Sequence, residues 1–126
     1  MDDESVPLIE RAKAVWSKAQ FVYNGPTRLG LPDALQVSLE IAQNHPECHD
    51  ALLTLLLSES QLVAAYALLT LEAMGSDVVR SLPVELLDCR KQISLQTGSF
   101  RNSTDFGGLA RQVQKRARQR QPSEGT

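Results

Sequence analysis

The stretch from Leu52 to Met74, LLTLLLSESQLVAAYALLTLEAM, constrains the fold of this chain more than any other. A membrane-crossing helix needs about 20 consecutive, mainly apolar residues. Here the polar tetrapeptide Ser58–Gln61 interrupts the run near its middle. Each carboxylate placed at membrane depth would cost roughly 2.5–3.5 kcal/mol. We therefore predict no membrane helix, but two antiparallel helices that reverse direction at Ser58–Ser60.

The second of these two helices carries signals at both of its ends. Ser60 is a good N-cap residue, because its hydroxyl can accept a hydrogen bond from a free backbone N–H of the first turn. Gly75 follows the apolar run and can adopt the left-handed conformation that ends a helix. Between them the helix is apolar on nearly every side. Such a helix packs against several neighbours, so we expect it at the centre of the fold.

The remaining chain predicts more helices joined by turns. We expect helices over residues 6–23, 33–44, 46–57 and 83–94, because Pro or Ser precedes each apolar pattern and Gly or Pro follows the first two. Aromatic residues make up only 5% of the chain, so the core must be mostly aliphatic. Long runs rich in Val, Ile and Thr, typical of strands, are missing. The predicted fold is all-α, with stacked antiparallel helix hairpins in a short α-solenoid or an irregular helical bundle.

One segment resembles a known repeat family. In CHDALLTLLLSESQLVAAYALLTLEAMGSDVV, residues 48–79, a Leu-rich helix precedes a short polar turn, a second helix with small residues near its start, and a Gly near its end. This order is similar to that of HEAT-type repeats. The resemblance implies stacked helix pairs and a role in binding and scaffolding rather than in catalysis.

Charge divides the chain into two parts. Residues 1–97 carry seven Lys and Arg against 13 Asp and Glu, a net charge of -6, whereas residues 98–126 carry six against two, a net charge of +4. We predict a helical domain over 1–97 and a polar linker with a basic C-terminal tail over 98–126. Thr104 or Asp105 can cap a tail helix, whose apolar stripe would be Phe106, Leu109, Ala110 and Val113.

The cations of the tail lie within residues 111–120. They can neutralise several phosphates of a nucleic acid, although no aromatic side chains lie between them to stack on bases. A solvated tail, or one that pairs with the acidic body of this or another copy, is the alternative interpretation. The cations are Arg111, Lys115, Arg116, Arg118 and Arg120.

The hexapeptide HPECHD, residues 45–50, contains both histidines of the chain and one of its two cysteines. His45, Cys48 and His49 are suitable zinc ligands, but their spacing matches no established zinc pattern. A helix junction also explains the segment. Cys48 and Cys89 are expected to be reduced thiols. We expect no cofactor, and neither cysteine is expected to act as a nucleophile.

These observations predict a non-enzymatic, cytoplasmic helical-repeat module that binds a protein or peptide partner. The polar stripe Gln36, Glu40 and Gln43 is the expected contact surface on the helix 33–44. Two alternatives stay open: a small nucleic-acid-associated regulator that uses the basic tail, and a metal-binding protein that uses the segment His45–Asp50. Homo-oligomers are compatible with the sequence, and an exposed Leu68 would indicate self-association.

Overall fold

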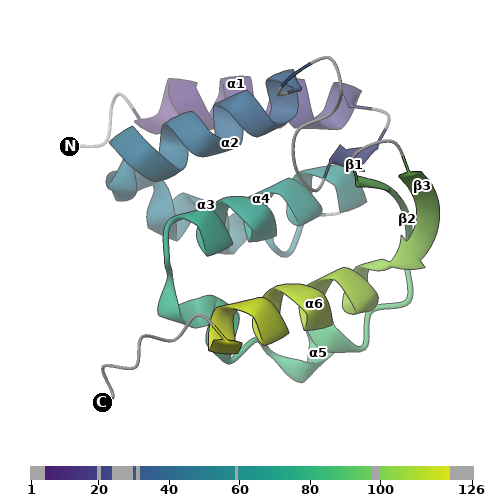
Figure 1. The fold of residues 1–126 in the computed structure, drawn as a ribbon. Coiled ribbons are helices and arrows are strands. Elements are labelled where there is room, and N and C mark those ends of the chain that lie inside the picture. Colours follow the sequence, from purple (N-terminus) through teal and green to yellow (C-terminus); the bar gives the residue numbers. More distant parts are fainter. Residues whose placement is uncertain are drawn as a thin grey trace.

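The computed structural model describes residues 5–19, 21–23, 30, 32–58, 60–97 and 100–119. Figure 1 shows three tiers of helices, α1 with α2, α3 with α4, and α5 with α6, and a small sheet at one end. The elements are α1 (Ser5–Lys18), β1 (Val22–Tyr23), α2 (Asp33–Asn44), the 3-10 helix η1 (Pro46–Cys48), α3 (His49–Leu55), α4 (Gln61–Ala73), the 3-10 helix η2 (Asp77–Arg80), α5 (Val84–Leu87), β2 (Gln92–Thr97), β3 (Phe100–Asp105) and α6 (Phe106–Gln119).

The predicted reversal between α3 and α4 is confirmed. Ser60 is the N-cap of α4, and its hydroxyl accepts a hydrogen bond from Val63 N–H at 3.3 Å. At the other end Gly75 has φ 74°, and the N–H groups of Gly75 and Ser76 donate to Glu72 and Leu71 carbonyls. This is the Schellman arrangement, which satisfies the free carbonyls of the last turn.

Helix α4 lies at the centre of the fold, as its apolar surface predicts. Every residue from Val63 to Glu72 is buried, and α4 contacts α1, α2, α3 and α6. Leu68 is fully buried, so the idea that it is an exposed site of self-association is wrong. None of the described helices combines the length and the hydropathy needed to cross a membrane.

Two aromatic side chains join α4 to α1, α2 and β1. The Trp16 indole stacks on the Tyr66 ring with centroids 6.0 Å apart, and its Nε1–H donates to the Ala34 carbonyl at 3.0 Å. The Tyr66 hydroxyl donates to the Phe21 carbonyl at 2.6 Å and accepts from Tyr23 N–H at 2.9 Å. Burial raises the pKa of Tyr66, although the Tyr23 N–H acts in the opposite direction. The hydroxyl therefore fixes the backbone between α1 and β1.

We expect Tyr66→Phe to lower the free energy of unfolding by about 1–3 kcal/mol, because a part-buried backbone donor and acceptor lose their partner. The raised pKa adds a pH signature. The unfolded tyrosine ionises first, so its contribution is full below about pH 10 and falls above it, by up to roughly 1.4 kcal/mol per pH unit. Urea unfolding at pH 7 and pH 11 measures both effects. Tyr66→Phe should remove this alkaline decline; an unchanged pH dependence would contradict the assignment.

The sheet corrects the prediction of an all-α fold. We predicted a helix to Ser94 and a polar linker from residue 98, but α5 ends at Leu87, and β2 and β3 form an antiparallel hairpin. The parallel strand β1 pairs with β2, so the order is β1-β2-β3, and α1 ends at Lys18 rather than at Tyr23. Ile93 and Leu95 are buried, whereas Gln92 and Ser94 are exposed. This alternation buries one face of β2 in the core, which a helix could not do.

The basic tail is part of the same core. The cap prediction is confirmed at Asp105, whose carboxylate accepts from Gly108 N–H at 2.7 Å. All residues of the predicted apolar stripe are buried, and Ala117 continues it. Helix α6 packs against α4, α5 and η2. Within the described residues, the segment after Thr97 therefore continues the body through β3 and α6, instead of forming a linker and a separate tail.

Candidate functional site

The surface between α1 and α2 is the strongest candidate site. The two helices run antiparallel, so the end of α1 lies beside the start of α2 (Figure 1). We name this surface the α1–α2 face, and it consists of Leu8, Arg11, Val15, Lys18, Asp33, Gln36, Glu40 and Gln43. Residues at these spacings share one side of each helix. The face combines one side of α1 with one side of α2, and the sequence of either helix alone does not show that the two sides are adjacent.

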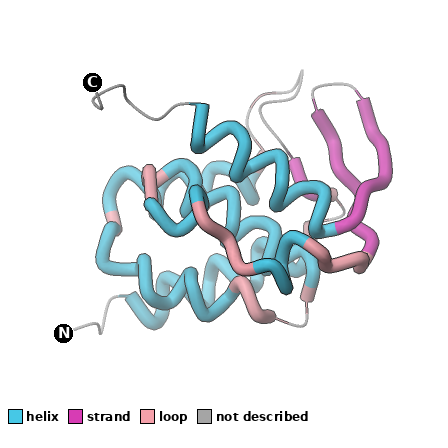
Figure 2. Tube along the Cα trace, turned by 90° about the horizontal axis from the view of Figure 1, so that it is seen from below, coloured by secondary structure: helices cyan, strands magenta, loops and turns pink. Residues whose placement is uncertain are grey.

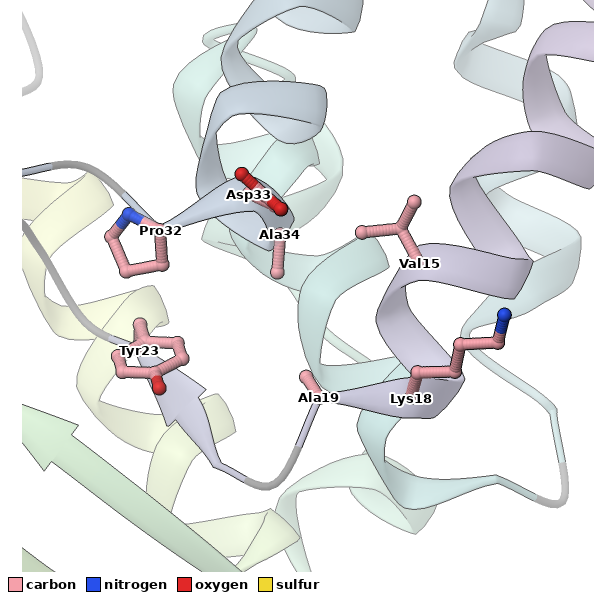
Figure 3. Close-up of a pocket in the computed structure, with 7 residues that line it drawn as sticks. All are labelled: Val15, Lys18, Ala19, Tyr23, Pro32, Asp33 and Ala34. Carbon is pink, nitrogen blue, oxygen red and sulfur yellow. The ribbon is translucent and has the colours of Figure 1, made fainter.

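A cavity of about 330 Å³ lies at one end of this face. Figure 3 shows that its lining comes from α1, β1 and the start of α2. Val15, Ala19 and Ala34 supply apolar surface, and Tyr23 adds an aromatic ring. Lys18 and Asp33, both exposed, add one positive and one negative charge. The cavity is therefore apolar with charges of both signs among its lining residues.

A second cavity of about 410 Å³ lies at the other end, lined by Pro7, Leu8, Arg11 and His45. Between the two cavities Arg11 and Glu40 approach to 3.9 Å across the helices. Both side chains are more than 45% exposed, at 61% and 49%. An exposed pair of this kind contributes about 0–1 kcal/mol to stability. It can exchange its partners for those of a bound molecule at little cost.

The predicted stripe of Gln36, Glu40 and Gln43 belongs to this face, and all of its members are exposed. The face carries cations on α1, at Arg11 and Lys18, and carboxylates on α2, at Asp33 and Glu40. Sequence reasoning missed the α1 half and both cavities. The α1 half could have been found from the intervals of three and four residues between Leu8 and Lys18. These intervals place partly exposed apolar residues and basic residues on one side of α1.

The residues of HPECHD do not converge on one point. His45 Nδ1 lies 3.1 Å from Glu47 Oε2, His49 Nε2 lies 2.7 Å from Ser76 Oγ, and Cys48 is fully buried in the core. The pKa of Glu47 is lowered by a backbone hydrogen bond and then by His45. The described part of the chain holds no group of three or more metal-ligating side chains. Both cysteines are free thiols, as expected.

Ser76, His49 and Asp50 lie in an order that resembles a hydrolase triad. His49 bridges the Ser76 hydroxyl and the fully exposed Asp50 carboxylate, which is 3.6 Å from Nδ1. Acyl transfer also needs free N–H donors for the oxyanion. The N–H groups of Gly75 and Ser76 are bonded to α4 carbonyls, and Val78 N–H donates to the Ser76 hydroxyl. The arrangement connects α3 to the turn after α4, where the N–H groups of Gly75, Ser76 and Val78 already have acceptors.

Most cations of the tail form ion pairs or hydrogen bonds with other parts of the chain. Arg116 donates to both carboxylate oxygens of Glu72, at 2.9 and 2.8 Å. Arg111 pairs with Asp88 at 3.1 Å, and Arg118 Nε donates to the Arg80 carbonyl at 3.0 Å. Lys115 is exposed, and Arg120 lies outside the described residues. Three of the five predicted phosphate-binding cations thus have partners in the body.

Comparison with known proteins adds no relative. No protein-family model, curated protein or solved structure matches this chain.

Proposed function

We propose that the protein is a non-enzymatic module that binds a protein or peptide partner through the α1–α2 face. The observation that carries the proposal is the pair of cavities at the two ends of that face, with the exposed Arg11–Glu40 pair between them. Each cavity offers apolar surface to an anchoring side chain. Charges near the anchors can fix register and orientation, as in peptide-binding grooves.

The dimensions of the face fit a short peptide segment. Helix α2 has 12 residues and is therefore about 18 Å long at a rise of 1.5 Å per residue, with residues 32–34 at its start lining one cavity and His45 at its end lining the other. A helical segment of about 12 residues, or an extended one of about 6, spans this distance. Such a segment would carry an apolar residue at each end, carboxylates facing Arg11 and Lys18 of α1, and cations facing Asp33 and Glu40 of α2. The HEAT-like character of α3 and α4 remains part of the same proposal, because repeats of that type generally bind proteins.

The partner can be captured by a photo-crosslinking amino acid placed at Gln43, with the same amino acid at Gln112 as a matched control. Gln43 lies on the α1–α2 face, and Gln112 is exposed on α6. We expect a partner in the native host that crosslinks from Gln43 and not from Gln112. Equal products from both positions would reflect random collision and would contradict the proposal.

Charge reversal then tests the face directly. We expect Asp33→Lys combined with Glu40→Lys to raise the Kd of the captured partner about tenfold, equivalent to about 1.4 kcal/mol. The control variant, Asp50→Lys with Glu85→Lys, makes the same charge change at exposed positions elsewhere. Titration calorimetry measures both. A control that weakens binding as much as the test variant would show a general charge effect and would refute the proposed face.

A further inference from the structure

Strand β3 forms an outer edge of the sheet. It pairs with β2 on one side, and the order β1-β2-β3 places no described strand on the other. Figure 2 shows the hairpin of β2 and β3 extending from the helical body. Arg101, Asn102 and Ser103 are exposed. The strand carries two charged residues, Arg101 and Asp105, but it has no Pro, no Lys and no bulge in its described register, three of the devices that protect an edge from pairing.

The ladder fixes which backbone groups of β3 point outward. Phe106 N–H donates to the Lys91 carbonyl at 2.8 Å, in register with the pairs Thr104–Ile93 and Asn102–Leu95. Hydrogen-bonded pairs alternate with non-hydrogen-bonded pairs in an antiparallel ladder. Asn102 and Thr104 therefore bond to β2. The N–H and C=O groups of Arg101 and Ser103, and the N–H group of Asp105, are directed away from β2, toward the open edge.

These outward residues are complementary to themselves. If a second copy is aligned antiparallel and centred on Ser103, then Ser103 faces Ser103 and Arg101 faces Asp105. We propose that β3 pairs with β3 of a second copy of this chain and joins the two sheets into one. Each Ser103 exchanges both backbone hydrogen bonds with its counterpart. Each Asp105 N–H donates to an Arg101 carbonyl of the other copy, while the Asp105 carbonyl accepts the first bond of α6.

The charges of the outer face agree with this register. Side chains of residues 101, 103 and 105 lie on the same face of the strand, so each arginine stands opposite a carboxylate. Arg101 is held on that face by Gln96, at 3.1 Å from its Nε, and by the Phe21 ring, 4.3 Å from its guanidinium carbon. An unrelated peptide would need its own matching charges. A second copy provides them by symmetry, and for this reason it is the favoured occupant.

Sedimentation equilibrium of the full chain from about 1 to about 200 µM tests the proposal, because a dimer of this kind depends on concentration. We expect a dimer whose Kd rises about tenfold or more in Ser103→Pro. Proline removes an outward N–H and leaves the ladder with β2 complete. Ser103→Ala keeps the N–H and should leave the Kd unchanged. A monomer throughout this range, or a dimer insensitive to Ser103→Pro, would overturn the proposal.

A crosslinking variant gives an answer even if Ser103→Pro does not fold. The two Cα atoms at position 103 would lie about 5.5 Å apart, within disulfide range. Ser103→Cys should therefore form a disulfide-linked dimer under mild oxidation much faster than Gln112→Cys. The wild-type chain, oxidised in the same way, measures how much covalent dimer forms through Cys89. Equal rates for the two variants would refute the symmetric register. This dimer is independent of the α1–α2 face, whose partner binding is measured separately.

Discussion

Gly107→Ala is expected to lower the free energy of unfolding by roughly 3 kcal/mol, the upper part of the range for overpacked sites. A Cβ at position 107 would stand directly against the Leu87 carbonyl oxygen and 2.9 Å from the Cys89 carbonyl oxygen. Both obstacles are backbone atoms, which cannot rotate away as a side chain can. The Gly107 N–H also donates a hydrogen bond to the Cys89 carbonyl oxygen at 2.8 Å, which holds the start of α6 close to this segment. Helix α6 must therefore move away from α5, which opens the core around Leu109. Urea unfolding followed by circular dichroism measures the loss.

Gly108→Ala is the matched control for this prediction. There the new Cβ would lie 2.6 Å from Thr104 Oγ1, which is the end of a side chain and can rotate. Alanine is favoured over glycine in a helix by about 1 kcal/mol, so we expect a change within about 1 kcal/mol of wild type. A similar loss at both positions would mean that the close approach of α6 to α5 is not the cause.

The α3–α4 hairpin could be predicted from sequence because every local signal there agrees. The polar break at Ser58–Ser60, the cap at Ser60 and the glycine at position 75 lie in sequence where the structure requires them. The central place of α4 followed from its apolar surface alone. When local signals agree in this way, the structure of a segment can be predicted without knowledge of the elements packed around it.

The sheet was missed because its signals are short and partly polar. Strand β2 has the alternation of Ile93 and Leu95 with exposed residues, but only four residues, 88–91, separate it from the apolar turn of α5. Strand β3, FRNSTD, has little strand propensity of its own. Its conformation depends on pairing with β2 and on the start of α6 at Phe106. Pairing of this kind is a tertiary effect, and composition alone indicated a linker.

The candidate site was predictable only in part, for a similar reason. Exposure of Gln36, Glu40 and Gln43 follows from the period of one helix, whereas the cavities depend on how α1 lies against α2. For the tail cations two interpretations stayed open, a nucleic-acid arm and pairing with the acidic body. The partners of Arg111, Arg116 and Arg118 lie in that body, at least 23 residues earlier in the chain. Charge counts do not reveal pairing at that separation.

Arg116→Ala is expected to lower the free energy of unfolding by about 3 kcal/mol, the lower end of the cost of removing one partner of a buried ion pair, because the Arg116 side chain is itself 33% exposed. The Glu72 side chain is 8% exposed and receives both hydrogen bonds of the guanidinium. Glu72 raises the pKa of Arg116, partly against the effect of burial. Because the folded pKa is raised, the contribution is fully present below the ordinary pKa of arginine. The loss should therefore be similar at pH 6 and pH 9.

Two comparison variants separate the buried pair from charge in general. Arg111→Ala removes an exposed pair with Asp88, whose side chains are 59% and 66% exposed, and should cost only about 0–1 kcal/mol. Replacing both members, Glu72→Met with Arg116→Leu, should restore most of the stability, since apolar side chains of similar volume often replace a buried pair without loss. If the double variant is as unstable as Arg116→Ala, the ion pair itself holds α6 against α4. If it recovers, apolar packing holds α6 there, and the arginine serves to neutralise Glu72.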